Sequence, residues 1–323
     1  MCNIHSRCTA WLSLHSIGID AEGCLKTPSW IPPFHSSQVG SCYIHLPHKK
    51  LTCIDVIAHG QFGYIDVGIY ELYGKKKEVY IKRPIVSQNL TYEACIQKLV
   101  HESLASIGFP LGSPPVIDIF ALNGSVCFAM EPIQGASTLN HYLDTVADIT
   151  VVLIDCLLQL CGMLSHIGSH LGINHRDLKP SNFLIVEHEL RMKRFAIETE
   201  SIMIASRYSL TMIDFGFACL GSIPLSEERI THLSLSDVYP PGDPCPKEGR
   251  DLFLFLGLLY LDYHAKLPPT LCGLFESWLN PSLCRFMRKD KVHSMQWLYF
   301  MAGNESIQKF QSPLRIFKDL QAL

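Results

Sequence analysis

The sequence predicts an α+β fold with two lobes, a small β-rich N-terminal half and a larger, mainly helical C-terminal half. Residues 51–84 are rich in β-branched and aromatic residues punctuated by glycines, which is typical of strands joined by turns. After residue 135 the apolar residues recur at helical spacing, most clearly over residues 149–164. A change from strands to helices along one chain indicates two halves, joined here by a short connection at residues 131–135.

The chain is expected to divide into three parts. Residues 1–45 are rich in Ser, Pro, His and Cys, which predicts a loosely structured N-terminal extension that packs on the domain. Residues 46–132 are expected to form the first lobe and residues 133–323 the second. No internal repeat or low-complexity tract is visible.

The first lobe is expected to contain one helix among its strands. Apolar residues recur at helical spacing over residues 92–107. Strand-like residues follow over 116–120 and 126–130. The predicted order is therefore strands, a helix, and two more strands before the connection.

Composition and charge exclude several classes of protein. Of the 323 residues, 48% are hydrophobic and 18% charged, so the chain is expected to be globular rather than disordered. The net charge of −3 gives no global field for nucleic acid or an anionic membrane, and neither is expected as a partner. The most apolar windows are residues 149–164, which contain Asp155 and Gln159, and residues 252–261, which are too short; both are predicted to be buried helices.

The 13 cysteines are an odd number and are spread along the chain, without a C-x-x-C pair or metal-ligand spacing. Free thiols in a reducing compartment are therefore predicted. The N-terminus lacks a charged region followed by an apolar run, so no signal peptide is expected. These features favour a cytoplasmic protein, with the nucleus or a virion left open. A monomer is expected.

Glycines and a lysine mark the strand region. Residues 57–65 read IAHGQFGYI, a strand–turn–strand in which Gly60 and Gly63 would let backbone amides approach phosphate groups. Taken alone, such glycines are common in hairpin turns. Lys82 ends the apolar strand at residues 79–82, where a lone lysine is usually solvated.

The helix that follows offers two acids as partners for this lysine. At about 100° per residue, Glu93 lies at the border of the apolar stripe, whereas Glu102 points largely away from it. The pattern favours Glu93 as the residue that reaches inward to Lys82 and a solvated Glu102, and it leaves the choice between the two acids open.

Two further segments concentrate polar residues next to apolar ones. Residues 173–185 read INHRDLKPSNFLI and combine a carboxylate, several cations and an amide with residues that belong in a core. Residues 212–217 read MIDFGF, in which Asp214 leaves a buried strand just before a glycine. Such concentrated polarity beside a core indicates a site rather than a surface loop.

Together these motifs resemble the eukaryotic protein kinase superfamily. Residues 175–182, HRDLKPSN, match its catalytic loop, and residues 214–216, DFG, match its metal-binding triplet. The resemblance covers residues 50–265. It implies a two-lobed kinase fold, ATP and Mg²⁺ as cofactors, and a protein substrate that the sequence does not identify.

The resemblance also implies roles in phosphoryl transfer, which mainly needs positioning and charge neutralisation. Asp177 would accept the proton of the substrate hydroxyl, and Lys179 would neutralise the transferring γ-phosphate. Asn182 and Asp214 would hold Mg²⁺, which prefers oxygen ligands.

For the nucleotide, the resemblance implies that Lys82 grips the α- and β-phosphates while Glu93 fixes its position. Met130 stands at the gatekeeper position, and residues 131–133 would be the hinge, in which Pro132 lacks an N–H donor. The residues implied in nucleotide binding besides Lys82 are Ala58, Gly60, Gly63 and Ile65 in the glycine loop and Met130, Glu131 and Ile133 near adenine.

Three residues near the catalytic base are assigned other roles. His175 is expected to be architectural and to pack near the Phe of the metal triplet, and Asp251 to anchor the catalytic loop from the next buried helix. Arg176 would receive a phosphate on the segment after Asp214, with Glu227 and Glu228 as a built-in alternative. The candidate phosphate acceptors in that segment are Ser222, Ser226, Thr231, Ser234 and Ser236.

The sequence departs from the family at several points. Ala58 replaces the first glycine of the phosphate loop. The stretch from Asn182 to Asp214 is longer than in most members, and its alternation predicts an extended hairpin. No Ala-Pro-Glu follows; residues 239–244, YPPGDP, predict a remodelled substrate platform. Beyond Pro268 the second lobe is expected to be short. These departures resemble divergent kinases, including those of large DNA viruses.

Three functions stay open at this point. The first is a Ser/Thr protein kinase, since tyrosine-directed members usually lack a lysine at the position of Lys179. The second is a catalytically weak pseudokinase that acts as a scaffold, although Lys82, Asp177, Asn182 and Asp214 are all retained. The third is a kinase of small molecules, such as choline or aminoglycosides, whose members lack the Arg-Asp-Leu-Lys-Pro series.

Overall fold

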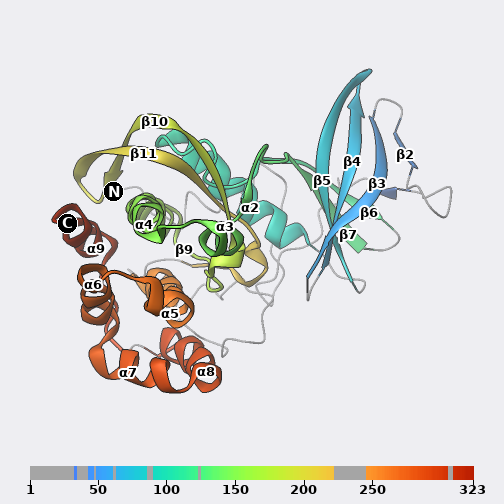
Figure 1. Ribbon diagram of the computed structural model, residues 1–323. Helices are drawn as coiled ribbons and strands as arrows, with labels where there is room; N and C mark the ends of the chain where they lie inside the picture. The colour runs from blue at the N-terminus through green and yellow to red at the C-terminus, as the bar shows by residue number, and fades with distance from the viewer. Residues whose placement is uncertain are drawn as a thin grey trace, which may run out of the picture.

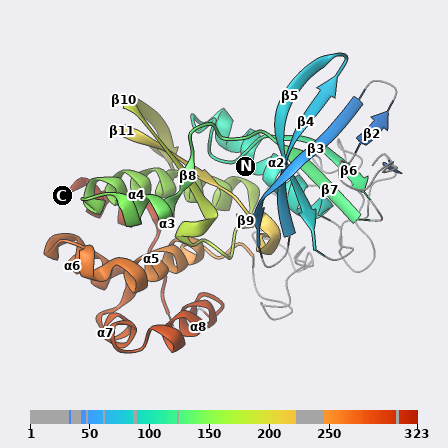
Figure 2. The ribbon, with the colours of Figure 1, turned by 45° about the vertical axis from the view of Figure 1, so that its right-hand side comes forward.

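The computed structural model has two lobes joined by a short connection (Figure 1). It describes residues 33–34, 43–46, 49–60, 63–85, 90–122, 125–221, 245–304 and 308–323. The smaller lobe is a twisted sheet with one helix, and the larger lobe is mainly helical, with a long hairpin on its outer side (Figures 1 and 2). The predicted two-lobed α+β fold is confirmed.

A seven-stranded sheet forms the N-lobe, in the order β1-β6-β7-β5-β4-β3-β2. All neighbours are antiparallel except β1 and β6. Its strands are β1 (Pro33–Phe34), β2 (Tyr43–Leu46), β3 (Lys49–His59), β4 (Gly63–Leu72), β5 (Lys75–Pro84), β6 (Val116–Leu122) and β7 (Ser125–Met130). β1 and β2 thus bring part of the predicted extension into the sheet, and the lobe limits at residues 46 and 133 stay predictions.

Helix α2 (Thr91–Ser106) connects the sheet to the C-lobe. Its small residues Ala94 and Cys95 pack in one cluster with β6 and β7. Its larger apolar residues, including Tyr92, Ile96 and Val100, pack into the core of the C-lobe. Helix α2 therefore packs against both the sheet and the core of the C-lobe.

The C-lobe is built around two buried helices, α4 and α5. Its elements are β8 (Ser137–Thr138), α3 (Leu139–Thr145), α4 (Ile149–His166), η1 (Ile167–Leu171), β9 (Ile173–Asn174), η2 (Pro180–Asn182), β10 (Phe183–Ile197), β11 (Glu200–Met212), η3 (Phe215–Phe217), β12 (Cys219–Leu220), α5 (Arg250–Tyr263), η4 (His264–Lys266), α6 (Pro269–Leu279), α7 (Pro281–Lys289), α8 (Lys291–Ala302) and α9 (Pro313–Gln321). The segment Ile149–Leu171 is long and apolar enough to cross a membrane, but 67% of its most apolar window is buried within the protein. Both apolar windows are thus buried helices, as predicted.

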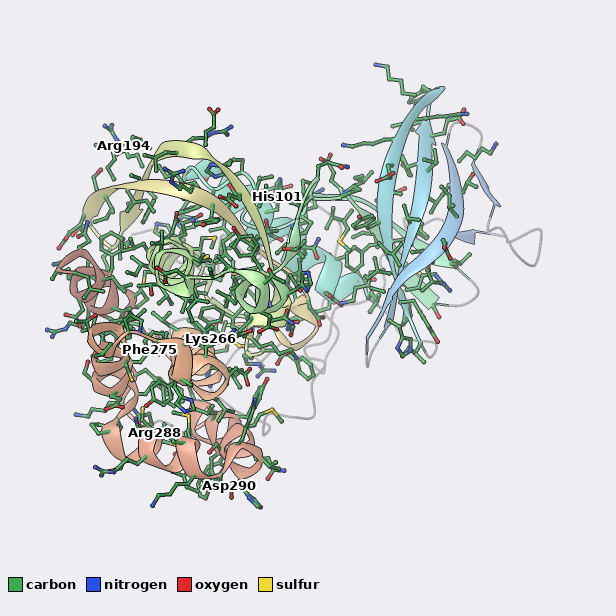
Figure 3. All side chains as sticks on the ribbon, in the orientation of Figure 1. His101, Arg194, Lys266, Phe275, Arg288 and Asp290 are labelled. Atoms are coloured by element: carbon green, nitrogen blue, oxygen red, sulfur yellow. A yellow bond between two sulfur atoms is a disulfide. The ribbon has the colours of Figure 1, made fainter. Side chains whose placement is uncertain are left out.

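The long hairpin of β10 and β11 confirms the prediction from sequence alternation. The two strands pair from Phe183 opposite Met212 to Ile197 opposite Glu200, with a register shift between Glu187 and Arg191. The hairpin lies over α4 (Figure 1), and Arg194 projects from its outer side (Figure 3).

A buried polar network attaches the hairpin to α4. Asp155 Oδ1 accepts hydrogen bonds from Gln159 at 2.6 Å and from Ser206 at 2.7 Å, and its Oδ2 accepts one from the backbone N–H of Arg207 at 2.8 Å. Lys193 donates to Gln159 Oε1 at 2.7 Å. The two polar residues that interrupt the apolar pattern of α4 therefore serve to hold the hairpin.

The C-terminal helices are held to α5 and to the hairpin. Arg288 of α7 donates to the Tyr260 hydroxyl and to Glu276 Oε1, at 2.8 and 2.7 Å, on the side of the lobe marked by Phe275 and Arg288 in Figure 3. α9 packs beside α4 and the hairpin (Figure 1), where Lys318 pairs with Glu200 at 2.7 Å.

One prediction about the cysteines is wrong. Cys219 in β12 and Cys245 before α5, which lie 26 positions apart in the sequence, form a disulfide. The two residues meet because β12 pairs with β9 and Gly221 donates its N–H to Gly172, which brings this strand beside Cys245. Sequence spacing gave no signal of this tertiary contact. Among the described cysteines, Cys95, Cys156, Cys161, Cys272 and Cys284 are free thiols.

Candidate active site

Lys82 lies at the centre of a buried cluster that joins the two lobes. Its Nζ lies 2.5 Å from Glu93 Oε1 on α2 and 2.8 Å from Asp214 Oδ1, which follows β11. The side chains of Lys82 and Glu93 are 13% and 4% exposed, whereas that of Asp214 is 34% exposed. The lysine is thus held from one side, while the second carboxylate stays accessible.

Charge outweighs burial at two of these three groups. Burial alone would lower the pKa of Lys82, but Glu93 and Asp214 raise it above its ordinary value. Burial opposes ionisation of Asp214, but Lys82 lowers the pKa of this carboxyl. Glu93 is buried, and burial raises its pKa despite the opposing effect of Lys82. The lysine is therefore charged at neutral pH, as binding of phosphates requires.

As the sequence pattern favoured, Glu93 and not Glu102 is the partner of Lys82. Glu102 lies on the exposed side of α2, 3.9 Å from Lys98 one turn earlier. The angular position of each acid on the helix favoured this choice.

Asp177, the predicted base, is held by residues of its own loop. Its Oδ2 accepts hydrogen bonds from Lys179 Nζ at 2.8 Å and from Asn182 Nδ2 at 2.9 Å. Asn182 Nδ2 also donates to the Asp177 backbone carbonyl at 2.9 Å. These contacts fix one carboxylate oxygen and direct the other, Oδ1, away from the loop.

The catalytic loop is anchored from beneath by α5. Asp251 accepts hydrogen bonds from the backbone N–H groups of His175 and Arg176, at 2.7 and 2.8 Å. The His175 ring packs on the Phe215 ring with centroids 4.8 Å apart. The predicted anchoring role of Asp251 and the architectural role of His175 agree with these contacts.

Arg176 is almost fully buried and adopts a left-handed backbone conformation with φ of 66°. Its Nε donates to the carbonyl of Phe217 at 2.8 Å, directly after the metal triplet. The segment whose phosphate it was expected to receive, with Ser222, Ser226, Thr231, Ser234, Ser236 and the acids Glu227 and Glu228, lies outside the described residues, as do residues 239–244.

Asn182 and Asp214 lie on adjacent strands of chain. The backbone N–H of Ile213 donates to the Asn182 carbonyl at 3.0 Å. This hydrogen bond brings the backbone just before Asp214 next to Asn182, the other predicted metal ligand. Because Asn182 uses its amide nitrogen on Asp177, its other polar end is the amide oxygen. An amide oxygen beside a partly exposed carboxylate is a donor set that fits Mg²⁺.

Comparisons with known proteins bear on the fold. No protein-family model matches the chain. The chain is similar to calcium-dependent protein kinase 25 of Arabidopsis thaliana, with 29% identity over 185 residues, which cover 54% of this chain and 31% of the plant protein. It is also similar to the crystal structure of the BubR1 kinase domain, with a TM-score of 0.54 and 14% identity over 98% of this chain and 92% of that chain.

The chain has a protein-kinase-like fold. The structural likeness shows the fold, and with the sequence likeness it supports a kinase-type phosphotransferase in general. A fold of this class generally implies ATP and a divalent metal. The chain spans 31% of the length of the plant protein that it matches.

In this kinase-like fold, the glycine loop connects β3 and β4. Ala58 pairs with Ile65 across the two strands, and the N–H of Gly60 donates to the Gly63 carbonyl at 2.8 Å. A Cβ on Gly63 would lie 2.5 Å from the Arg83 carbonyl, so this glycine is required by the sheet itself. A Cβ on Gly60 would meet its nearest atom at 3.7 Å. Gly63 is therefore required by the close approach of β5, whereas the surroundings of Gly60 would accommodate a Cβ.

The hinge follows β7. Met130 is nearly buried beside Gln97, whose Nε2 lies 3.5 Å from the methionine sulfur. The N–H of Glu131 donates to the Pro115 carbonyl at 2.9 Å, and its carboxylate pairs with Lys77. Pro132 has no N–H, so Ile133 is the predicted hinge residue after Glu131 that has a backbone donor.

Two tyrosines near the site were missed by sequence reasoning. Tyr92 on α2 donates to the Ala218 carbonyl at 3.0 Å and so ties this helix to the segment after the metal triplet. Tyr299 on α8 donates to Asp177 Oδ1 at 2.6 Å. Tyr92 falls in the apolar stripe that predicted the helix, but no local pattern marks Tyr299, which lies 122 residues from its partner.

Proposed function

We propose that the chain is an ATP-dependent protein kinase that transfers the γ-phosphate of ATP to serine or threonine hydroxyls of a protein substrate. The contact of Lys82 with both Glu93 and Asp214 carries this proposal. A structural ion pair needs one carboxylate for one cation. Here a second, partly exposed carboxylate shares the lysine, which is the arrangement that nucleotide phosphates and a metal ion require.

The chemistry needs an acceptor oxygen, a base and a cation in one place. The acceptor oxygen attacks the γ-phosphorus, the bond from this phosphorus to the bridging oxygen breaks, and ADP leaves. Asp177 takes the proton of the acceptor hydroxyl, and its Oδ1 is the oxygen that its own loop does not use. Lys179, which holds the other oxygen at 2.8 Å, would neutralise the phosphate that moves.

Asn182 and Asp214 would hold Mg²⁺ through oxygen atoms, with the remaining ligands supplied by phosphate oxygens and water. When bound, the ion neutralises the charge of the phosphates. Among the described residues, no group of three or more His, Cys, Asp or Glu side chains has the geometry of a self-contained metal site. This composition fits an ion that arrives with the nucleotide.

The preference for serine and threonine rests on Lys179. Its resemblance to the lysine of Ser/Thr-directed kinases is supported by its contact with Asp177, which places it beside the base. The short serine or threonine side chain would bring the substrate backbone close to this lysine, so its stem also limits the space for longer side chains.

The test is transfer of labelled phosphate from ATP with Mg²⁺ to a generic acceptor protein. The parent chain is expected to label serine and threonine. Asp177→Asn is expected to lower the rate by about 10²–10⁴-fold, because the base is lost while the shape of the side chain is kept. Lys82→Ala is expected to abolish labelling, whereas Lys98→Ala, on the exposed side of α2, is the matched control that retains it.

Three other results would decide against this function. A parent chain that leaves proteins unlabelled but phosphorylates small alcohols would be a small-molecule kinase. A chain that labels nothing, yet melts at a higher temperature with ATP, would be a binding pseudokinase. Labelling that persists in both Asp177→Asn and Lys82→Ala would place the reaction at a different site.

A further inference from the structure

The base of the proposed reaction is already in contact with a hydroxyl of its own chain. Tyr299 Oη lies 2.6 Å from Asp177 Oδ1, within the distance at which a base takes a proton. Lys179 and Asn182 both use Oδ2 of the same carboxylate. Tyr299 therefore occupies the one oxygen of the base that is left for a substrate hydroxyl.

The position of Tyr299 is fixed by packing on both sides of it. A Cβ on Gly257 of α5 would lie 2.4 Å from Leu298, so α8 approaches α5 closely at the residue before Tyr299. Beyond it, Arg250 Nε donates to the Ala302 carbonyl at 3.1 Å, and Lys247 Nζ donates to that of Gly303 at 2.7 Å. The tyrosine is thus carried by an attached helix and not by a free tail.

The base and the tyrosine share the same support. Asp251 of α5 holds the backbone of the catalytic loop, and α8 lies directly beside α5 (Figures 1 and 2). Lys179 and Asn182, a predicted metal ligand, both donate to Asp177 Oδ2, so the base is joined to the phosphate and metal side of the site. The hydroxyl, the base and the cation therefore belong to one connected cluster.

We propose that Tyr299 is an intramolecular phosphate acceptor, and that the protein phosphorylates this residue before it acts on other proteins. This inference rests on the proposed function. The phenol oxygen of Tyr299 would attack the γ-phosphorus of ATP, the bond to the bridging oxygen would break with release of ADP, and the phenol proton would pass to Asp177. The products are ADP, a phosphotyrosine and a protonated Asp177 that returns its proton to water, so atoms and charge balance.

A tyrosine acceptor does not conflict with a preference for serine and threonine in other proteins. Tyr299 belongs to the same chain and is already held beside Asp177, so it does not have to bind from solution. Its effective concentration at the site is therefore higher by orders of magnitude than that of a separate substrate. The preference for short side chains applies to substrates that must dock from solution.

The transfer would also change the access to the base. A phosphotyrosine carries a charge of about −1.5 to −2 and would replace a hydrogen bond to Asp177 by repulsion between like charges. Asp177 Oδ1 would then become available to an external hydroxyl. Phosphorylation of an acceptor protein is therefore expected to begin after a lag that matches the modification of Tyr299.

The experiment follows both products in one reaction. The purified chain is incubated with labelled ATP, Mg²⁺ and a generic acceptor protein, and phosphorylated residues are mapped over time by mass spectrometry. We expect phosphate on Tyr299 first, at a fractional rate that does not depend on protein concentration, and then label on the acceptor. Tyr299→Phe is expected to lose the phosphotyrosine and the lag, whereas Tyr73→Phe, at a tyrosine that is 77% exposed, is expected to behave like the parent.

The outcomes separate this inference from the proposed function. Label on the acceptor with Tyr299 unmodified overturns the inference and leaves the proposed function intact. A faster reaction of Tyr299→Phe, when the parent forms no phosphotyrosine, also overturns it, because the tyrosine would then only block the base. Label on neither product overturns both, and the mapping of the parent decides this without any variant.

Discussion

Two partly buried lysines in this molecule have different electrostatic surroundings. Lys82, in the candidate active site, donates to two carboxylates, and their charge raises its pKa although burial acts in the other direction. Lys193, between the hairpin and α4, donates to the amide oxygen of Gln159 and to the carbonyl of Tyr208. There burial is the largest effect and lowers the pKa of Lys193 to about 8.

The difference shows what separates a site from a structural network in this fold. Both networks are buried and satisfied by hydrogen bonds, so burial alone does not distinguish them. In the hairpin network, the lysine donates to two neutral oxygens, and the attraction of the Asp155 charge does not offset the effect of burial on the lysine pKa. In the active site, an excess of carboxylate keeps the lysine charged and leaves Asp214 with capacity for a further cation.

Among the variants that test this comparison, the largest effect is expected from removing one carboxylate around Lys82. Glu93→Gln keeps the shape of the side chain but removes the charge that positions Lys82. Since a displacement of about 1 Å in a positioning group costs on the order of 10²-fold in rate, we expect a loss of this size in transfer to an acceptor protein. The measurement is the initial rate at saturating ATP.

Glu102→Gln is the matched control for this variant, because the residue is an exposed glutamate on the same helix. Its rate is expected to equal that of the parent. Equal losses in the two variants would mean that the helix as a whole, and not the contact with Lys82, determines the rate.

Much of the active site was predictable because its residues form contiguous motifs. The catalytic loop occupies eight successive positions, and the metal triplet directly follows a strand, so each could be recognised without knowledge of the fold. The angle between helix positions favoured Glu93 over Glu102. The hairpin of β10 and β11 was predictable because alternation with period two is a local property of the sequence.

The contacts that sequence reasoning missed join residues far apart in the chain. Tyr299 lies in α8, which carries apolar residues on its exposed side as well as its buried one, so its pattern indicates no preferred face. Asp155 and Gln159 were visible only as interruptions in an apolar helix, and their partners appear once the hairpin folds back over α4. Such tertiary contacts leave no periodic signal in the sequence.

A smaller effect, on stability instead of rate, is expected from the hairpin network. Asp155→Ala leaves the donors of Gln159, Ser206 and Arg207 without their common acceptor. Losing the acceptor of a buried donor costs about 1–3 kcal/mol. The free energy of unfolding in denaturant is therefore expected to fall by this amount, while transfer well below the melting temperature is retained.

Asp55→Ala serves as control for this prediction, because Asp55 is exposed on β3. Its cost is expected to stay within about 0.5 kcal/mol. If Asp155→Ala instead lowered the rate with unchanged stability, the hairpin network would belong to the catalytic machinery, and the comparison between the two lysines would fail.

The smallest effect concerns the pH dependence that Lys193 contributes. The pKa of this lysine is lowered to about 8 in the folded chain, against about 10.4 for an unperturbed lysine. Between these values the unfolded chain binds a proton that the folded chain has released, so this residue makes the free energy of unfolding rise with pH.

Lys193→Met removes the contribution while keeping an unbranched side chain. The free energy of unfolding of the parent, minus that of the variant, is therefore expected to increase from about pH 8 to about pH 10. The neighbouring Asp155, Cys156 and Arg191 are present in both chains, and a difference that stays constant over this range would mean that Lys193 does not lose its proton there.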